Sequence, residues 1–396
     1  MEFGKDSVVA VLSPSHGNAP YLVGAEIGRK VGEIARKENT PLQYGVLVPL
    51  FYPGTQEGIM KRRLGPKGLD DIYLSRELGE LLLPVMQNRA GYANYLSGLA
   101  AHGEETQRAF QERLKKPVKA VSLGTGKEET ILPESMRFEI NTWMQLATGL
   151  PAYNTSSFIF PEFARRVADV ADKGYGERRI ELLIGVTAEK LRCAAEIFER
   201  ARGAQAYRKV LMPRIHTLSF VNGREQHENE IRTPPLKSKM PMNLSPMPNF
   251  VYANISGAGY GERELLERLK GFKEQGIEIV FPPTMVSTAE KIGGRVAPES
   301  VLSNEACIGT VGRAGWGTIW EAYVNTPGKR FFPVTCTDGD FEITFNEWSL
   351  ESEPPSTDPE GGVSLERAWH ADRKQFGITD GIDYAAKIIA AEQDLV

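Results

Sequence analysis

This chain of 396 residues has few cysteines, no excess of positive charge and no long apolar run. Its three cysteines, Cys193, Cys307 and Cys336, are too few and too scattered for a disulfide framework or a zinc site, which fits a reducing cytoplasm. A net charge of −4 makes nucleic acid an unfavourable partner. No run approaches the ~18 apolar residues of a membrane span, and the amino-terminal segment predicts a buried strand in place of a signal peptide.

Strand-like and helix-like segments alternate in both halves of the chain, separated by a proline-rich stretch from Gly223 to Pro248. Such alternation is typical of doubly wound α/β domains, and the length of the chain favours two of them. We expect two Rossmann-like domains facing a central cleft, with ligands at the carboxyl ends of the strands. One of the helices is predicted over Met136–Thr148. The expected parts are an acceptor-binding domain, a linker, a nucleotide-sugar-binding domain and a helix that packs back on the first domain: 1–225, 226–249, 250–378 and 379–396.

The most informative segment, Gly312 to Ala322, reads Gly-Arg-Ala-Gly-Trp-Gly-Thr-Ile-Trp-Glu-Ala. Its glycines predict a strand-to-helix turn where a ligand can approach the backbone, and the helix start suits a phosphate. Arg313 adds a planar cation, and Glu321 adds a carboxylate that can accept hydrogen bonds from a pair of sugar hydroxyls. The segment therefore predicts a nucleotide site, against the alternative of a glycine-rich turn kept only for packing.

Two other glycine-rich segments do not match the motifs that they approach. Residues 122–127, Ser-Leu-Gly-Thr-Gly-Lys, lack the leading glycine of a P-loop, and Glu128 stands where Ser or Thr is required. Residues 257–261 follow a predicted strand, but the third glycine of a dinucleotide fingerprint comes one position early. Neither a P-loop nor an NAD site is predicted.

Four features of the second half carry a family resemblance. They are the turn Ser256-Gly257-Ala258-Gly259, the run from Arg313 to Ala322, Pro333 at twelve residues after Glu321, and the segment Glu342-Ile343-Thr344-Phe345-Asn346. Together they resemble the nucleotide-binding domain of GT-B glycosyltransferases, in the branch of the peptidoglycan N-acetylglucosaminyltransferase and the UDP-glycosyltransferases. Ile343 departs from the glutamine of that family.

The resemblance implies a donor site built from these features. The residues implied to bind the nucleotide and its phosphates are Ser256, Gly257, Gly259, Val296, Arg313, Gly315, Trp316, Gly317, Thr318 and Glu321. The residues implied to bind the donor sugar are Asp338, Asp340 and Glu342. The resemblance implies no metal and no cofactor besides the nucleotide-sugar co-substrate, because glycine amides, a helix start and Arg313 can stabilise the charge of the leaving diphosphate.

The first half carries a looser likeness to the same family. His16-Gly17-Asn18-Ala19-Pro20 resembles the Gly-His-x-x-Pro turn after the family's first strand, and Ala147-Thr148-Gly149-Leu150-Pro151 resembles Ala-x-x-Leu-Gly-Ile-Pro. The likeness implies that His16 is the general base for an acceptor hydroxyl, a task that suits the ordinary pKa of histidine. The alternative is a turn histidine that caps the following helix.

The implied function is an inverting, metal-independent glycosyltransferase that moves a sugar from a UDP- or TDP-linked donor to a hydroxyl of a small-molecule or lipid-linked acceptor. A first alternative is a non-catalytic nucleotide-sugar-binding protein or a partner subunit of a transferase. A second is an enzyme like the UDP-sugar 2-epimerases, which the five histidines of the chain disfavour.

A basic segment lies in the first half, with Lys61, Arg62, Arg63 and Lys67 among apolar residues. We expect a solvated loop there. The alternative is a surface that meets an acidic or lipid-linked acceptor, or that makes weak peripheral contact with a membrane.

Overall fold

The structure is a computed structural model that describes most of the chain. The described residues are 2–13, 18–38, 42–66, 68–86, 92–141, 148–155, 165, 168, 188–189, 192–193, 195–196, 199–200, 207–213, 228–255, 262–313, 315–328, 330–334, 362–377 and 380–396.

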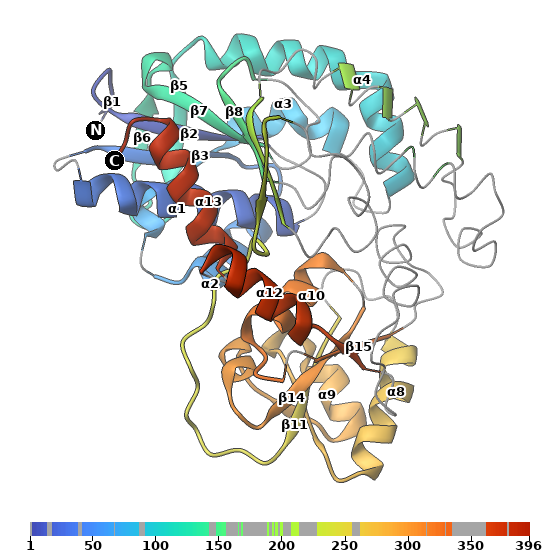
Figure 1. Ribbon diagram of the computed structural model, residues 1–396. Coiled ribbons are helices and arrows are strands. Elements are labelled where there is room, and N and C mark those ends of the chain that lie inside the picture. Colours follow the sequence, from blue (N-terminus) through green and yellow to red (C-terminus); the bar gives the residue numbers. More distant parts are fainter. Residues whose placement is uncertain are drawn as a thin grey trace.

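Ten of the described strands form one sheet, which belongs to the first domain (Figure 1). Seven neighbouring strands are parallel, from β4 to β10, and the hairpin of β5 and β6 extends the sheet antiparallel at one side. In sheet order the strands are β1 (Glu2–Phe3), β6 (Glu128–Ile131), β5 (Val118–Ser122), β4 (Ile72–Ser75), β3 (Tyr44–Pro49), β2 (Val8–Ser13), β7 (Met136–Asn141), β8 (Ala152–Asn154), β9 (Tyr207–Pro213) and β10 (Glu230–Thr233).

Strands β2 and β3, in the middle of the sheet, are almost entirely apolar because helices cover both faces of a parallel sheet. All six residues of β2 are buried, and so are all six of β3. The long helix α1 approaches β3 closely, since a Cβ on its Gly32 would lie 2.4 Å from the ring of Tyr44. The helices of this domain whose full extent is described are α1 (Asn18–Glu38), α2 (Thr55–Leu64), α3 (Arg76–Met86) and α4 (Tyr92–Leu114), with the short 3-10 helices η1 (Leu69–Asp71) and η2 (Pro133–Ser135).

The helix predicted over Met136–Thr148 is wrong, because residues 136–141 form strand β7 beside β2. The side chains of Met136, Phe138 and Ile140 are buried and alternate with polar residues, which is the two-residue period of a strand. In β7 even the polar positions 139 and 141 are buried, since both faces of the sheet are covered.

Six described strands form the second sheet, and five of them are parallel. Their order is β13 (Arg295–Val296), β12 (Glu278–Phe281), β11 (Phe250–Asn254), β14 (Cys307–Gly312), β15 (Arg330–Pro333) and the antiparallel β16 (Val363–Ser364). The helices that follow these strands are α8 (Glu262–Glu274), η4 (Pro283–Met285), α9 (Val286–Ile292), η5 (Glu299–Ser303), α10 (Trp316–Asn325) and α12 (Glu366–Phe376). The phenylalanines of α8 and β15, Phe272 and Phe332, meet edge to face in the core between helix and sheet.

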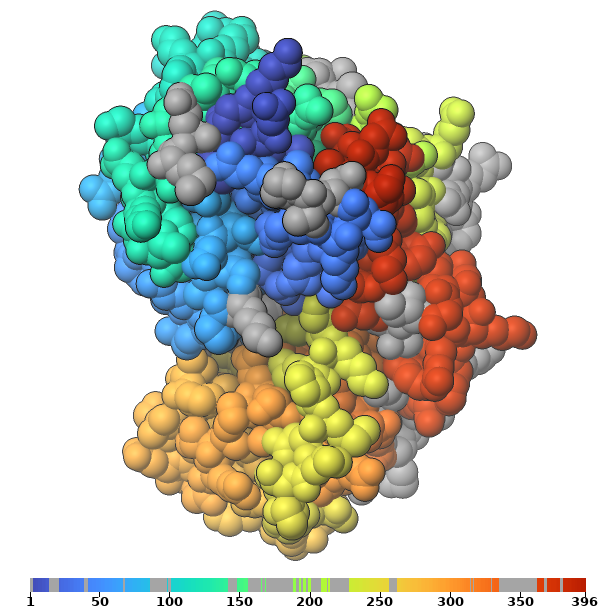
Figure 2. Space-filling model, turned by 90° about the vertical axis from the view of Figure 1, so that its left-hand side faces the viewer, coloured from blue at the N-terminus to red at the C-terminus, as the bar shows by residue number. Residues whose placement is uncertain are grey.

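The chain crosses between the two domains at two places. The first is a crossing segment, residues 234–249, that follows β10 and runs over the surface of the molecule to β11 (Figures 1 and 2). Strand β10 is part of the first sheet although it lies beyond the boundary expected at residue 225, so the crossing begins about eight residues later than expected. The proline pair at the start of the crossing segment can be seen in the sequence. The short strand β10 just before that pair has little apolar periodicity, so the sequence did not reveal it.

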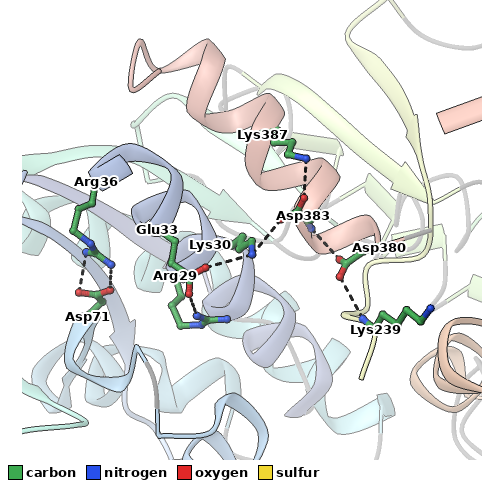
Figure 3. A network of polar contacts seen from close by, with 9 residues as sticks. All are labelled: Arg29, Lys30, Glu33, Arg36, Asp71, Lys239, Asp380, Asp383 and Lys387. Atoms are coloured by element: carbon green, nitrogen blue, oxygen red, sulfur yellow. Dashed lines mark hydrogen bonds and ion pairs between the residues drawn. The ribbon is translucent and has the colours of Figure 1, made fainter. Parts of the chain in front are cut away.

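The second crossing leads from α12 to the last helix, α13 (Gly381–Glu392), which packs against α1 of the first domain. Asp380 begins α13 by accepting hydrogen bonds from the amides of Asp383, at 3.0 Å, and of Lys239 in the crossing segment, at 3.3 Å. Asp383 in turn pairs with Lys30 of α1 at 3.2 Å and with Lys387 at 2.8 Å (Figure 3). The two crossings are therefore joined to each other and to the first domain at the start of α13.

Among the described residues, no helix is long and apolar enough to cross a bilayer. No cluster of three or more histidine, cysteine or acidic residues suited to a metal ion occurs in that part of the chain either.

Candidate nucleotide site

The predicted nucleotide turn lies at the carboxyl end of β14, in the middle of the second sheet. Strand β14 ends at Gly312, and α10 begins at Trp316 with Gly315 in the N-cap position. The carbonyl oxygen of Gly315 accepts the amides of Thr318 and Ile319, both at 3.0 Å. The first amides of the helix, those of Trp316 and Gly317, have no partner within a helix by its geometry. They are the groups that an anion would meet.

The three glycines of the turn differ in what surrounds them. A Cβ on Gly312 would lie 2.3 Å from the backbone oxygen of Asn254 in β11, so packing alone requires glycine there. Apart from the adjoining chain and the backbone of α10 itself, no described atom lies within 4 Å of the corresponding position on Gly315 or Gly317. The backbone of these two glycines thus borders open space, which is the property needed for a ligand to approach it.

Arg313 and Thr318 are both buried beside this turn. The exposed fraction of Arg313 is 6%, so its side chain lies within the protein and not on the surface. Thr318 is 3% exposed, and its methyl carbon would lie 3.3 Å from a Cβ on Gly312. Both residues therefore belong to the framework of the turn, which the burial makes rigid.

Glu321 lies in the second turn of α10, and only 2% of its side chain is exposed. One oxygen, Oε1, is 3.0 Å from Nζ of Lys237 in the crossing segment and 3.2 Å from Nη1 of Arg63 in α2. Burial raises the pKa of the carboxyl, but the ion pairs with Lys237 and Arg63 outweigh this, and the pKa of Glu321 lies below its ordinary value. A buried carboxylate thus remains ionised at the predicted ribose position.

A second carboxylate stands next to Glu321. Glu299, the first residue of η5, pairs with the same nitrogen of Arg63. Burial and the nearby charge of Glu321 raise the pKa of Glu299, against the opposing effect of Arg63 and Lys237. Tyr252 of β11 completes the surroundings with a buried hydroxyl that has no hydrogen-bond partner among the described residues. We call Arg63, Lys237, Glu299 and Glu321 the interdomain ion cluster.

Sequence reasoning missed three of the four residues of this cluster. The expectation of a solvated loop is wrong for Arg63, which lies at the end of helix α2 and reaches two carboxylates of the other domain. Lys237 falls in a stretch without periodicity, and Glu299 lies three positions after Val296, which was the residue of this region expected to bind the nucleotide. A carboxylate cannot be matched to cations 84 or 258 positions earlier in the chain without the fold, so no sequence signal could have found these pairs.

The remaining predicted residues divide into one that is described and several that are not. Val296 is half-exposed on the edge strand β13, three positions before Glu299, so its backbone lies on the same side of the second domain as the ion cluster. Outside the described residues lie His16, Ser256, Gly257, Gly259, Asp338, Asp340 and Glu342, together with the side chain of Trp316.

The first domain holds a second buried polar group that the sequence did not indicate. Glu139 of β7 is fully buried and accepts hydrogen bonds from Asn141, at 2.8 Å, and from Thr148. It also bonds Ser13, the last residue of β2. Burial raises the pKa of Glu139 to about 7, in spite of the opposing hydrogen bonds from Thr148, Asn141 and Ser13. The group lies towards the carboxyl ends of β2 and β7, the edge where open α/β sheets bind ligands.

Comparison with known proteins establishes the fold. No family model and no curated protein sequence matches the chain. Among solved structures, that of LpCGTa in complex with UDP superposes with a TM-score of 0.54 at 12% identity, covering 98% of this chain and 94% of that one. Less well superposed are apo UGT2 of Phytolacca americana (TM-score 0.49, 12% identity, 98% and 95% covered) and the glycotransferase of kitacinnamycin (0.49, 14%, 98% and 99%). The chain has the two-domain GT-B fold that its motifs predicted.

Proposed function

We propose that this chain transfers a sugar from a UDP- or TDP-linked donor to a hydroxyl group of an acceptor. One observation carries the proposal: a single helix, α10, combines an open, glycine-lined start with a buried, ionised carboxylate, Glu321, in its second turn. The start of a helix suits a diphosphate, and a carboxylate accepts hydrogen bonds from ribose hydroxyls. The fold, shared with a protein whose structure was determined with UDP, supports the same assignment.

The proposed chemistry is a direct displacement at the anomeric carbon. The acceptor oxygen forms the new bond as the bond to the diphosphate breaks, and the electron pair of that bond leaves with the nucleotide. The acceptor proton passes to His16 as general base. The amides at the start of α10 and the guanidinium of Arg313 supply positive charge where negative charge develops. A single displacement inverts the anomeric configuration.

Donor binding is tested by thermal unfolding with UDP, TDP, GDP, ADP, NAD and UDP-sugars. A ligand at 100 times its dissociation constant stabilises the folded state by about 2.7 kcal/mol, which raises the unfolding temperature measurably. We expect this shift with UDP or TDP. It should be lost in Glu321→Gln and kept in the control Glu267→Gln, an exposed glutamate of α8 that pairs with Lys270. A shift with NAD alone would contradict the proposal.

Turnover is tested separately from binding. With the nucleotide identified, His16→Ala should bind the donor as the unchanged protein does and lose transfer to acceptor hydroxyls. The readout is the release of free nucleotide from the UDP- or TDP-sugar, measured with and without a mixture of acceptors. Donor binding with no release of nucleotide in either form would favour the non-catalytic alternative instead.

A further inference from the structure

The interdomain ion cluster places a cation of the first domain on the carboxylates of the second. A single nitrogen of Arg63, Nη1, lies 3.2 Å from Oε1 of Glu321 and also pairs with Oε2 of Glu299. Arg63 is in the last turn of α2, whereas the two acids lie in α10 and η5 of the other domain. The contact therefore joins the two domains through side chains, in addition to the two places where the chain crosses between them.

The ion pair at Glu321 is shielded from water. Glu321 is 2% exposed, Lys237 19% and Arg63 32%. Surface ion pairs contribute little because water and salt screen them, but a pair around a buried carboxylate is screened much less. Removal of one cation leaves a buried charge less well compensated, so whatever replaces Arg63 must itself satisfy Glu321.

This arrangement conflicts with an unhindered nucleotide site. Under the proposed function, Glu321 accepts hydrogen bonds from the ribose hydroxyls, yet its Oε1 already accepts from both Lys237 and Arg63. We propose that Arg63 competes with the ribose for Glu321 and that the nucleotide has to displace Arg63 from this carboxylate. The inference rests on the proposed function of the same site.

Glu299 has a different part in this competition. Its carboxylate holds the guanidinium of Arg63 beside Glu321, and the positive charges of Arg63 and Lys237 oppose the repulsion between the two carboxylates. Glu299 is thus a positioning residue for Arg63. Because Arg63 belongs to the first domain, its displacement also loosens one contact between the domains, which couples nucleotide binding in the second domain to the position of the first.

The test measures the affinity of UDP and of TDP by calorimetry for the full chain and three variants. Arg63→Gln removes the competing cation, and Glu299→Gln removes the group that holds it. Arg62→Gln is the matched control, since Arg62 is the neighbouring arginine on the same helix and is exposed. We expect Arg63→Gln to bind the nucleotide about tenfold more tightly, the size of effect of a partly shielded ion pair. Glu299→Gln should shift affinity in the same direction, and Arg62→Gln should bind as the unchanged protein does.

The possible outcomes separate this inference from the proposal on which it rests. Equal or weaker nucleotide binding by Arg63→Gln overturns the competition, and weaker binding would make Arg63 a ligand of the nucleotide. Failure of every form to bind UDP or TDP overturns the donor site itself. Glu299→Gln leaves Arg63 and Glu321 in place, so it decides the question if Arg63→Gln does not fold, as checked by circular dichroism.

Discussion

The buried carboxyl of Glu139 gives a prediction about stability that can be worked out from the structure. Its side chain has no exposed surface, and its pKa is raised from 4.5 to about 7. A raised pKa means that the folded state binds the proton more tightly than the unfolded state does. The contribution of this proton to stability is therefore complete below about pH 4.5, declines as the pH rises towards 7, and is absent above it.

The full size of this effect follows from the difference between the two pKa values. At 1.36 kcal/mol per pKa unit, the loss between pH 4.5 and pH 8 is about 3 kcal/mol. Glu139→Gln should remove the pH dependence while keeping the shape. Its amide oxygen can accept from Asn141, and its amide nitrogen can donate to the hydroxyl of Thr148, as the protonated acid would.

The assay is urea unfolding of both proteins at pH 5, 6, 7 and 8. The difference between the two free energies of unfolding cancels the other titrating groups, which the variant leaves unchanged. That difference should move by about 2–3 kcal/mol in favour of Glu139→Gln as the pH rises from 5 to 8. Glu267→Gln, at an exposed position, should show no such trend. Parallel pH profiles for the unchanged protein and Glu139→Gln would refute the reasoning, because they would mean that Glu139 is ionised throughout this range.

Two further predictions concern the joint between the domains and the role of metal. Gly381→Ala should lower the unfolding temperature, because its Cβ would lie 2.2 Å from the carbonyl oxygen of Pro235 and 2.4 Å from that of Pro234. The control Gly271→Ala, in α8 with open space around it, should be neutral or stabilising by about 0.5–1 kcal/mol. If the chain is metal-independent, as the family resemblance implies, EDTA should leave the rate of sugar transfer unchanged. A loss of transfer that Mg²⁺ or Mn²⁺ restores would contradict this. It would point to Asp338-Gly339-Asp340, a carboxylate pair of the kind that hard cations bind.

The sequence predicted the second domain better than the first, and the difference has a physical cause. In the second domain the strands β11, β12, β14 and β15 are short apolar runs bounded by turns, so the alternation of strands and helices can be seen in the sequence. In the first domain β7 was mistaken for part of a helix, because Glu139 and Asn141 are polar residues buried in a central strand. Polar residues in such a strand conceal both its period and its burial.

The site was predictable only where its residues are neighbours in the chain. The helix α10, its glycine turn and the position of Glu321 on that helix follow from local sequence, because an N-cap glycine and a helical spacing are local features. The cations that surround Glu321 come from α2 and the crossing segment, and only the packing of two domains brings them there. Whether a buried acid of this kind is free to accept a ribose is thus a property of tertiary structure, not of the motif.

Substitutions at two glycines of the same segment can distinguish a turn that binds a ligand from a turn kept for packing. Gly312→Ala forces a Cβ to within 2.3 Å of the Asn254 carbonyl, so it should destabilise the protein by about 1–3 kcal/mol whether or not a ligand binds. Gly315 has φ −74° and open space around it, so alanine fits the free protein and should change its stability by less than about 0.5 kcal/mol. If a diphosphate rests on this turn, however, the new methyl group stands where the phosphates approach, and UDP or TDP affinity should fall. Unchanged nucleotide affinity in Gly315→Ala, together with a destabilised Gly312→Ala, would mean that the turn serves packing and that the nucleotide binds elsewhere.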